Sequence, residues 1–131
     1  MHVTRVAVGR AKLVYAIVAD RKTEYTHGRS RVVYIGTTKN GISRVAQSAA
    51  YWTDTVLCQR GVRSFDVHLV TCPARQGVRI WNKLERAMLL TFREMFGEVP
   101  LCNTHGRRMR PTDEFRYFSR SGLRTIVEDL S

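Results

Sequence analysis

The chain has 131 residues, a length typical of one domain, and 44% of them are apolar, which is too many for a disordered basic tail. Its 22 Lys and Arg residues against 11 Asp and Glu residues give a net charge of +11 at pH 7, which favours a polyanionic partner. No apolar run approaches the roughly 20 residues of a membrane-spanning helix. The three cysteines lack a Cys-x-x-Cys pair and an even count. Membrane proteins and secreted disulfide scaffolds are therefore excluded, and we expect reduced thiols in a cytoplasmic protein.

Two strands and a helix are predicted in the first half of the chain. Residues 11–19 (AKLVYAIVA) are apolar on both alternate faces, as in a strand that is covered on both sides. Residues 31–36 (RVVYIG) are β-branched and aromatic, which predicts a second strand. The polar stretch 20–30 between them is predicted to be a long hairpin loop. Apolar residues recur at helical spacing over 42–56, which predicts a helix.

A strand and two helices are predicted in the second half. Residues 64–72 alternate between apolar and polar, whereas 78–96 carry an apolar helical stripe that ends before Gly97. A basic loop and a short helix over 121–130 follow. The order predicts a small α/β fold (an α+β sandwich) with a mainly antiparallel three-stranded sheet flanked by helices. We expect a single domain over 1–131, with a core at about 11–103 and a basic C-terminal extension at 104–131.

The positive charge is concentrated in the N-terminal third. Residues 1–50 carry a net charge of +7, and 18 of the 22 basic residues are arginine, which pairs bidentately with phosphate. Arginine-favouring codon usage would give a similar composition, but one surface that binds nucleic acid explains the clustering better. The candidate nucleic-acid-binding residues are Arg29, Arg31, Lys39, Arg107, Arg108 and Arg110.

Five residues stand out as a candidate catalytic group. Tyr15 and Tyr34 each lie in a short apolar strand and would be adjacent if the two strands pair. Arg44 lies off the apolar stripe of the first predicted helix, so it can face the same side. Glu85 is one residue off the stripe of the long helix, where a carboxylate would need a partner. Asn103 follows the turn at residues 100–102.

These residues resemble the motifs of the GIY-YIG endonuclease superfamily. Tyr34-Ile35-Gly36 matches the second half of the family name, and Leu13-Val14-Tyr15 stands where the first half belongs. Arg44, Glu85 and Asn103 complete the family's order of tyrosine, tyrosine, arginine, glutamate and asparagine. The resemblance covers residues 13–103. It implies a GIY-YIG-like fold and a divalent-metal-dependent endonuclease, a phosphodiester hydrolase, acting on DNA.

The resemblance also implies a role for each residue. Tyr15 would activate the attacking water and Tyr34 would support it through hydrogen bonds. Glu85 is a hard oxygen ligand suited to one Mg²⁺ (or Mn²⁺) ion, and Arg44 can donate hydrogen bonds to the phosphate oxygens. Asn103 would hold the metal-bearing loop or contact a phosphate.

Several alternatives stay open from the sequence. Ser48 stands where many family members have histidine or tyrosine, so the fold could bind nucleic acid with weak or no catalysis. If the fold does catalyse cleavage and Tyr15 is only a core residue, the general base could be Lys39, His27 or His105 instead. A basic structural RNA-binding protein is a further alternative, but it would have no use for a carboxylate among the tyrosines. The partner is expected to be single- or double-stranded DNA, RNA is not excluded, and the protein would act as a monomer or homodimer.

Overall fold

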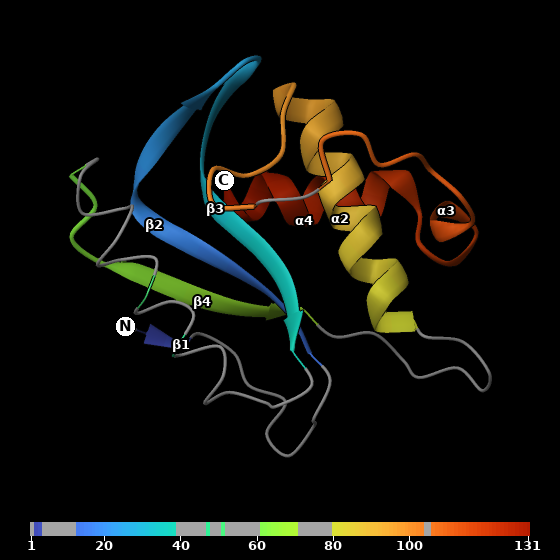
Figure 1. Cartoon of the computed structure of the whole chain (residues 1–131), viewed down its shortest axis with the longest axis horizontal. Helices are drawn as coiled ribbons and strands as arrows, with labels where there is room; N and C mark the ends of the chain where they lie inside the picture. The colour runs from blue at the N-terminus through green and yellow to red at the C-terminus, as the bar shows by residue number, and fades with distance from the viewer. Residues whose placement is uncertain are drawn as a thin grey trace.

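A computed structural model describes residues 2–3, 13–38, 47, 51, 61–70, 80–103 and 106–131. The elements of these ranges follow in chain order (Figure 1): β1 (His2–Val3), β2 (Leu13–Tyr25), β3 (Gly28–Thr38), β4 (Phe65–Val70), α2 (Ile80–Phe96), α3 (Glu114–Tyr117) and α4 (Arg120–Leu130). No helix within these ranges has the length and hydropathy needed to span a membrane.

The strands form one sheet with the order β1-β4-β2-β3. β2 is antiparallel to both β3 and β4, so the predicted α+β fold with an antiparallel three-stranded sheet is confirmed. β1 adds two residues that pair in parallel with β4. The sequence pattern did not predict this strand, because two residues are too few to show an alternation.

The predicted loop over residues 20–30 is wrong, because most of it belongs to β2 and β3. The strands continue to Tyr25 and from Gly28, which leaves a two-residue turn at Thr26 and His27. Tyr25 is buried, and its hydroxyl donates a hydrogen bond of 2.7 Å to the carbonyl oxygen of Val32. The charged neighbours that suggested a loop are side chains on the exposed part of a strand pair.

The turn of this hairpin is attached to the C-terminal end of α2 (Figure 1). The backbone nitrogen of His27 donates to the carbonyl oxygen of Phe96 at 2.9 Å. Glu98 accepts from the backbone nitrogen and the hydroxyl of Thr26 at 2.9 and 2.6 Å. α2 ends at Phe96, and the next residue, Gly97, has a φ of +80°, a left-handed conformation that glycine adopts without strain.

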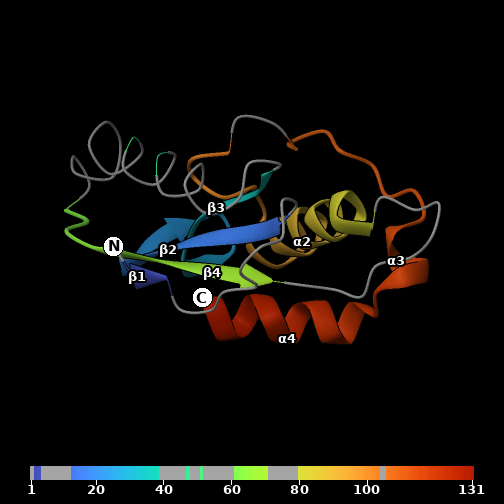
Figure 2. The ribbon, with the colours of Figure 1, turned by 90° about the horizontal axis from the view of Figure 1, so that it is seen from below.

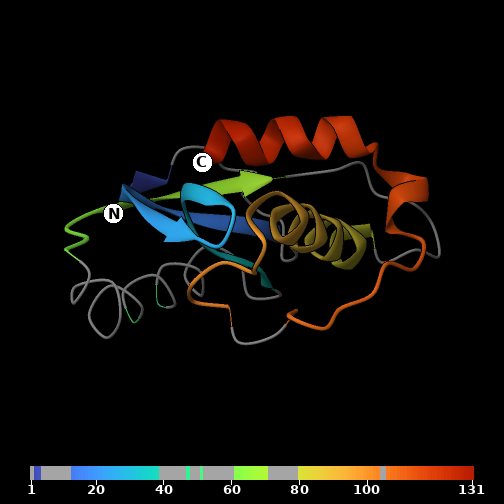
Figure 3. The same ribbon diagram turned by 90° about the horizontal axis from the view of Figure 1, so that it is seen from above.

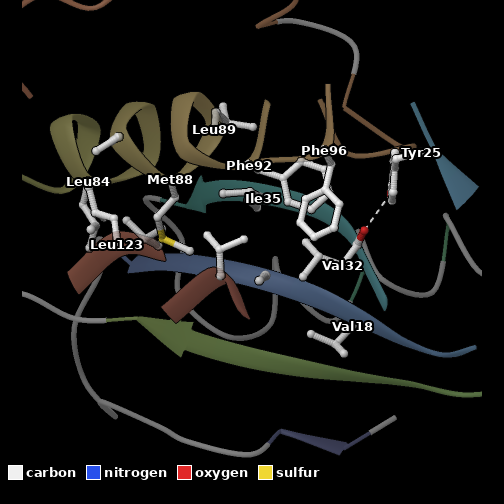
Figure 4. Packing of buried hydrophobic residues seen from close by; sticks show 14 residues of the cluster. Val18, Tyr25, Val32, Ile35, Leu84, Met88, Leu89, Phe92, Phe96 and Leu123 are labelled. Carbon is white, nitrogen blue, oxygen red and sulfur yellow. Dashed lines mark hydrogen bonds between the residues drawn. The ribbon is translucent and has the colours of Figure 1, made fainter. Parts of the chain in front are cut away.

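The helices cover one face of the sheet. Leu84, Met88 and Phe92 of α2 pack with Val32 and Ile35 of β3 (Figure 4). In two opposite views, each turned by 90° from Figure 1, α4 lies along this side, and the segment that joins α2 to α3 runs on the opposite side of α2 (Figures 2 and 3). The other sheet face carries a second cluster, which contains Tyr15, Ile17, Val67 and Leu69 among others.

The C-terminal extension contributes to the main core. Leu123 and Val127 of α4 are buried in the cluster that contains the α2 side chains. The predicted helix over 121–130 is confirmed, as is the long helix from Ile80 to Phe96. The helix predicted over 42–56 lies outside the described residues except for Gln47 and Tyr51, which are both helical.

An ion pair between a buried carboxylate and a partly exposed arginine attaches the extension to α2. The Nε atom of Arg86 donates to Oε1 of Glu114 at 2.5 Å, and Glu114 is only 1% exposed. Burial raises the pKa of this carboxyl, but hydrogen bonds from Arg86 and from the backbone and hydroxyl of Thr112 outweigh it and lower the pKa to about 2. Glu114 is therefore ionised at neutral pH.

Candidate functional site

Tyr15 and Tyr34 lie together on the sheet face opposite the one that α2 and α4 cover. Tyr15 is in register with Gly36 and Ile17 is in register with Tyr34, so the two tyrosines are diagonal neighbours on one face. Their ring centroids are 5.7 Å apart, with an interplanar angle of 37°. The expectation that the two strands bring these tyrosines together is confirmed.

A β-bulge in β3 gives Tyr34 this orientation. Val18 is in register with Val32 and Ile17 with Tyr34, so Val33 is an extra residue in β3. Because side chains alternate along a strand, Tyr34 would point toward α2 and α4 without the extra residue. The bulge therefore moves the Tyr34 ring to the face of Tyr15.

Gly36 leaves room for the Tyr34 ring. A Cβ atom at residue 36 would lie 2.6 Å from Cε1 of Tyr34 and 3.1 Å from its hydroxyl oxygen. Contacts this short are not tolerated, so any side chain at residue 36 would displace the ring. The Tyr-Ile-Gly sequence thus has a packing explanation in this protein.

The environment of Tyr34 keeps its hydroxyl protonated. Burial raises the pKa of Tyr34 most, the hydrogen bond with the Tyr15 side chain lowers it, and the charges of Glu85 and Cys102 raise it. The net result is a pKa above its ordinary value of 10.0. Tyr34 is therefore a neutral phenol near pH 7, able to hold a hydrogen bond but not to act as a base.

Glu85 comes to this site from α2. It lies one residue beyond the buried Leu84 and is itself half-buried, and its charge acts on Tyr34. The neighbouring Arg86 pairs with Glu114, and its terminal nitrogen donates to the carbonyl oxygen of Arg110 at 2.9 Å.

Asn103 acts on the site through the backbone of β3. Its Oδ1 atom accepts from the nitrogen of Ile35 at 3.0 Å, and its Nδ2 atom donates to the oxygen of Ile35 at 2.8 Å. The backbone nitrogen of Cys102 also donates to the oxygen of Val33 at 2.8 Å. The 102–103 segment therefore holds the strand on both sides of Tyr34.

The acidic donors near the tyrosines are few. Within the part of the chain that the structure describes, no group of three or more His, Cys, Asp and Glu side chains could hold a metal ion. Glu85 supplies one carboxylate, whose charge acts on the phenol of Tyr34. This donor set fits a hard cation such as Mg²⁺, which keeps several waters and binds substrate phosphates rather than a full protein cage.

The other expected residues divide between two regions. Arg44 and Lys39 lie outside the described residues, as does His105. Arg29 and Arg31 are exposed on β3, near the hairpin turn. Arg107, Arg108 and Arg110 are exposed on the segment between α2 and α3. The structure thus brings together the rings of Tyr15 and Tyr34, lets the charge of Glu85 act on Tyr34 and joins Asn103 to the same strand through Ile35. The described arginines of the expected set lie near the hairpin turn and on the segment between α2 and α3.

Two basic residues that the sequence analysis missed, Arg21 and Lys22, line a groove with Arg29 and Arg31. They were missed because a residue in a predicted loop has no assigned face. Their positive charge was the available signal.

Comparison of the chain with known proteins finds no matching family model, no matching curated protein and no matching solved structure.

Proposed function

We propose that the protein is a divalent-metal-dependent endonuclease that hydrolyses DNA phosphodiester bonds at a GIY-YIG-type site. The observation that carries the proposal is the contact of the Tyr15 and Tyr34 rings on one sheet face, with the Tyr34 ring over Gly36 and with the charge of Glu85, from α2, acting on Tyr34. These residues come from two strands and a helix, and packing alone does not require a carboxylate beside two phenols.

The two tyrosines have different roles in this proposal. The phenolate form of Tyr15, whose own proton has passed to solvent, would accept a proton from the attacking water, and the protonated Tyr34 would hold the Tyr15 oxygen through their hydrogen bond. Glu85 would hold the metal ion, which supplies positive charge to the phosphate when bound. Arg44, from the sequence, would donate hydrogen bonds to the non-bridging phosphate oxygens.

Asn103 has a positioning role rather than a chemical one. Both of its amide atoms bond to Ile35, the residue between Tyr34 and Gly36. Its contribution is therefore to fix the strand that carries the phenol.

The direct test is a cleavage assay with labelled single- and double-stranded DNA in MgCl₂, MnCl₂ or EDTA. We expect cleavage that requires the metal and that falls at least about 100-fold in Glu85→Gln. Glu94→Gln is the matched control, because Glu94 lies on the exposed side of the same helix and pairs with Arg120 and Arg124. Cleavage that persists in EDTA, or that Glu85→Gln leaves unchanged, would contradict the proposal.

The second candidate is a nucleic-acid-binding module of the same fold without efficient catalysis. The observation that favours it is the basic groove near the hairpin turn, which is separate from the tyrosines. This candidate predicts tight DNA or RNA binding in EDTA and no cleavage of either under any metal condition.

A further inference from the structure

We infer that the groove beside the β2–β3 turn is a second phosphate-binding site, which holds the nucleic-acid backbone several nucleotides away from the tyrosines. Its volume is about 410 Å³, and its described lining consists of Arg21, Lys22, Thr23, Arg29, Arg31 and Val62. Four of these six side chains are cationic and none is acidic. The inference deepens the proposed function, and its statement about substrate length rests on that function.

An irregularity in the strand pairing gathers the four cations. β2 and β3 are in register at Val18 with Val32 and again at Thr23 with Ser30. Between these pairs the four residues 19–22 of β2 lie opposite Arg31 alone. The excess length pushes Arg21 and Lys22 out of the ladder beside Arg31.

The groove opens on the same side of the sheet as the tyrosines. Val32 faces the helices, and Ser30 bonds to Ser131 at the end of α4, so the alternation directs Arg29 and Arg31 to the other face. Val62, which lines the groove, packs in the cluster that contains Tyr15. The guanidinium of Arg21 also lies on this side, over Gly61.

The chemistry of the lining favours a chain of phosphates over other anionic surfaces. Three of the four cations are arginines, whose planar donors match phosphate oxygens bidentately. The only apolar lining residue, Val62, is buried, so the described groove offers no apolar side chain for insertion into a membrane. A repeating phosphodiester backbone satisfies several spaced cations at once.

The strand itself sets the distance between the two sites. Arg31 and Arg29 precede Tyr34 by three and five residues on β3, which corresponds to at most roughly 10 and 16 Å because the bulge at Val33 shortens the strand. Phosphates of one DNA strand repeat about every 3.4 Å along the helix axis. A strand cleaved at the tyrosines would therefore reach the groove about three to five phosphates away, so shorter flanks would lose this contact.

The test compares two double variants in a Glu85→Gln background, which separates binding from cleavage. Arg29→Gln/Arg31→Gln removes two groove cations, and Arg116→Gln/Arg124→Gln removes the same charge from exposed positions on α3 and α4. Fluorescein-labelled duplex DNA is titrated at several salt concentrations. We expect the groove variant to bind about tenfold more weakly and to lose nearly two units of the slope of log K against log salt.

A slope and an affinity that change equally in the two double variants would overturn the inference. So would unchanged DNA binding with lost binding to phosphatidylserine vesicles, which would indicate a membrane surface instead. A selective loss in the groove variant supports the inference even if the wild-type chain never cleaves DNA, in which case only the proposed function fails.

Substrate length provides a second measurement in the cleaving wild type. Shortening one flank of the scissile bond to about two phosphates should reduce cleavage, and Arg29→Gln/Arg31→Gln should be insensitive to that shortening. Equal sensitivity of both proteins to flank length would contradict the proposed spacing of the two sites.

Discussion

The phenol ring of Tyr34 occupies the space that a side chain at residue 36 would fill. The position of a Cβ atom on Gly36 lies 2.6 Å from Cε1 of Tyr34, and Gly36 is itself in register with Tyr15. The glycine therefore allows the two tyrosines to meet. A sequence motif with glycine two residues after tyrosine has a direct structural consequence here.

We expect Gly36→Ala to displace the Tyr34 ring and to reduce cleavage by at least about 100-fold, because misplacement by an ångström disrupts a catalytic geometry. Overpacking should lower the free energy of unfolding by about 1–3 kcal/mol. Cleavage rates and urea unfolding measure the two effects.

A double variant isolates the contact behind this prediction. In Tyr34→Ala/Gly36→Ala the ring is gone, so the added methyl group should cost little beyond the effect of Tyr34→Ala alone. Equal destabilisation by Gly36→Ala in both backgrounds would show that the Tyr34 ring is not the cause.

Removal of the Tyr15 hydroxyl tests the assignment of the general base. Tyr15→Phe keeps the buried ring and loses one hydrogen bond, so stability should fall by about 1 kcal/mol while cleavage falls about 100-fold or more. Tyr25→Phe is the matched control: its hydroxyl bonds to Val32 and accepts from the nitrogen of Leu101 at 3.0 Å. It should be destabilised at least as much, and a large cleavage defect in it would contradict a special role for Tyr15.

Asn103→Ala should destabilise the protein through β3. The substitution leaves the buried nitrogen and oxygen of Ile35 without their amide partner, which should cost about 2–4 kcal/mol. Asn82→Ala, on the exposed face of α2, should change stability by less than about 0.5 kcal/mol. Equal unfolding midpoints for the two variants in urea would remove Asn103 from its positioning role.

Because of the ion pair of Glu114 with Arg86, the free energy of unfolding should fall as the pH falls below about 4.5. The pKa of Glu114 is about 2 in the folded protein against 4.5 as its ordinary value, so its contribution is complete above pH 4.5 and disappears as the pH falls toward 2. The shift corresponds to about 3 kcal/mol, which screening at the half-exposed Arg86 reduces to about 2 kcal/mol. Wild type should therefore lose most of this contribution, roughly 1.5 kcal/mol more than Glu114→Gln loses, between about pH 6 and about pH 2.5 in urea unfolding. Parallel stability curves for the two proteins would contradict the prediction.

Apolar and alternating residues predicted the central parts of β2, β3 and β4, and helical spacing predicted α2 and α4. These patterns are visible in the sequence because they arise from the burial of an element's faces. The hairpin between the strands was predicted wrongly because the polar residues 20–24 and 29–31 lie on strands that continue past the edge of the core. Burial of Tyr25, which the pattern gave no reason to expect, depends on Phe92 and Phe96 of α2, far away in the chain.

For the candidate site, too, the sequence predicted the residues but not their arrangement. Residue type and order identified Tyr15, Tyr34, Glu85 and Asn103, because phenols, carboxylates and amides carry recognisable chemistry. The sequence could not show that Tyr34 faces Tyr15, since an extra residue at Val33 reverses the alternation. Nor could the sequence show that both polar amide atoms of Asn103 form hydrogen bonds with the backbone of Ile35.

The sequence by itself determined the class of fold, the excess of positive charge and the residue types of the candidate site, because these depend on composition and on local periodicity. Tertiary structure alone decided which side chains meet. The bulges in β2 and β3 set the faces of Tyr34 and of the groove arginines, and Gly36 sets the position of the phenol ring. Such arrangements depend on strand register and on contacts between segments distant in the chain, to which no local pattern is sensitive.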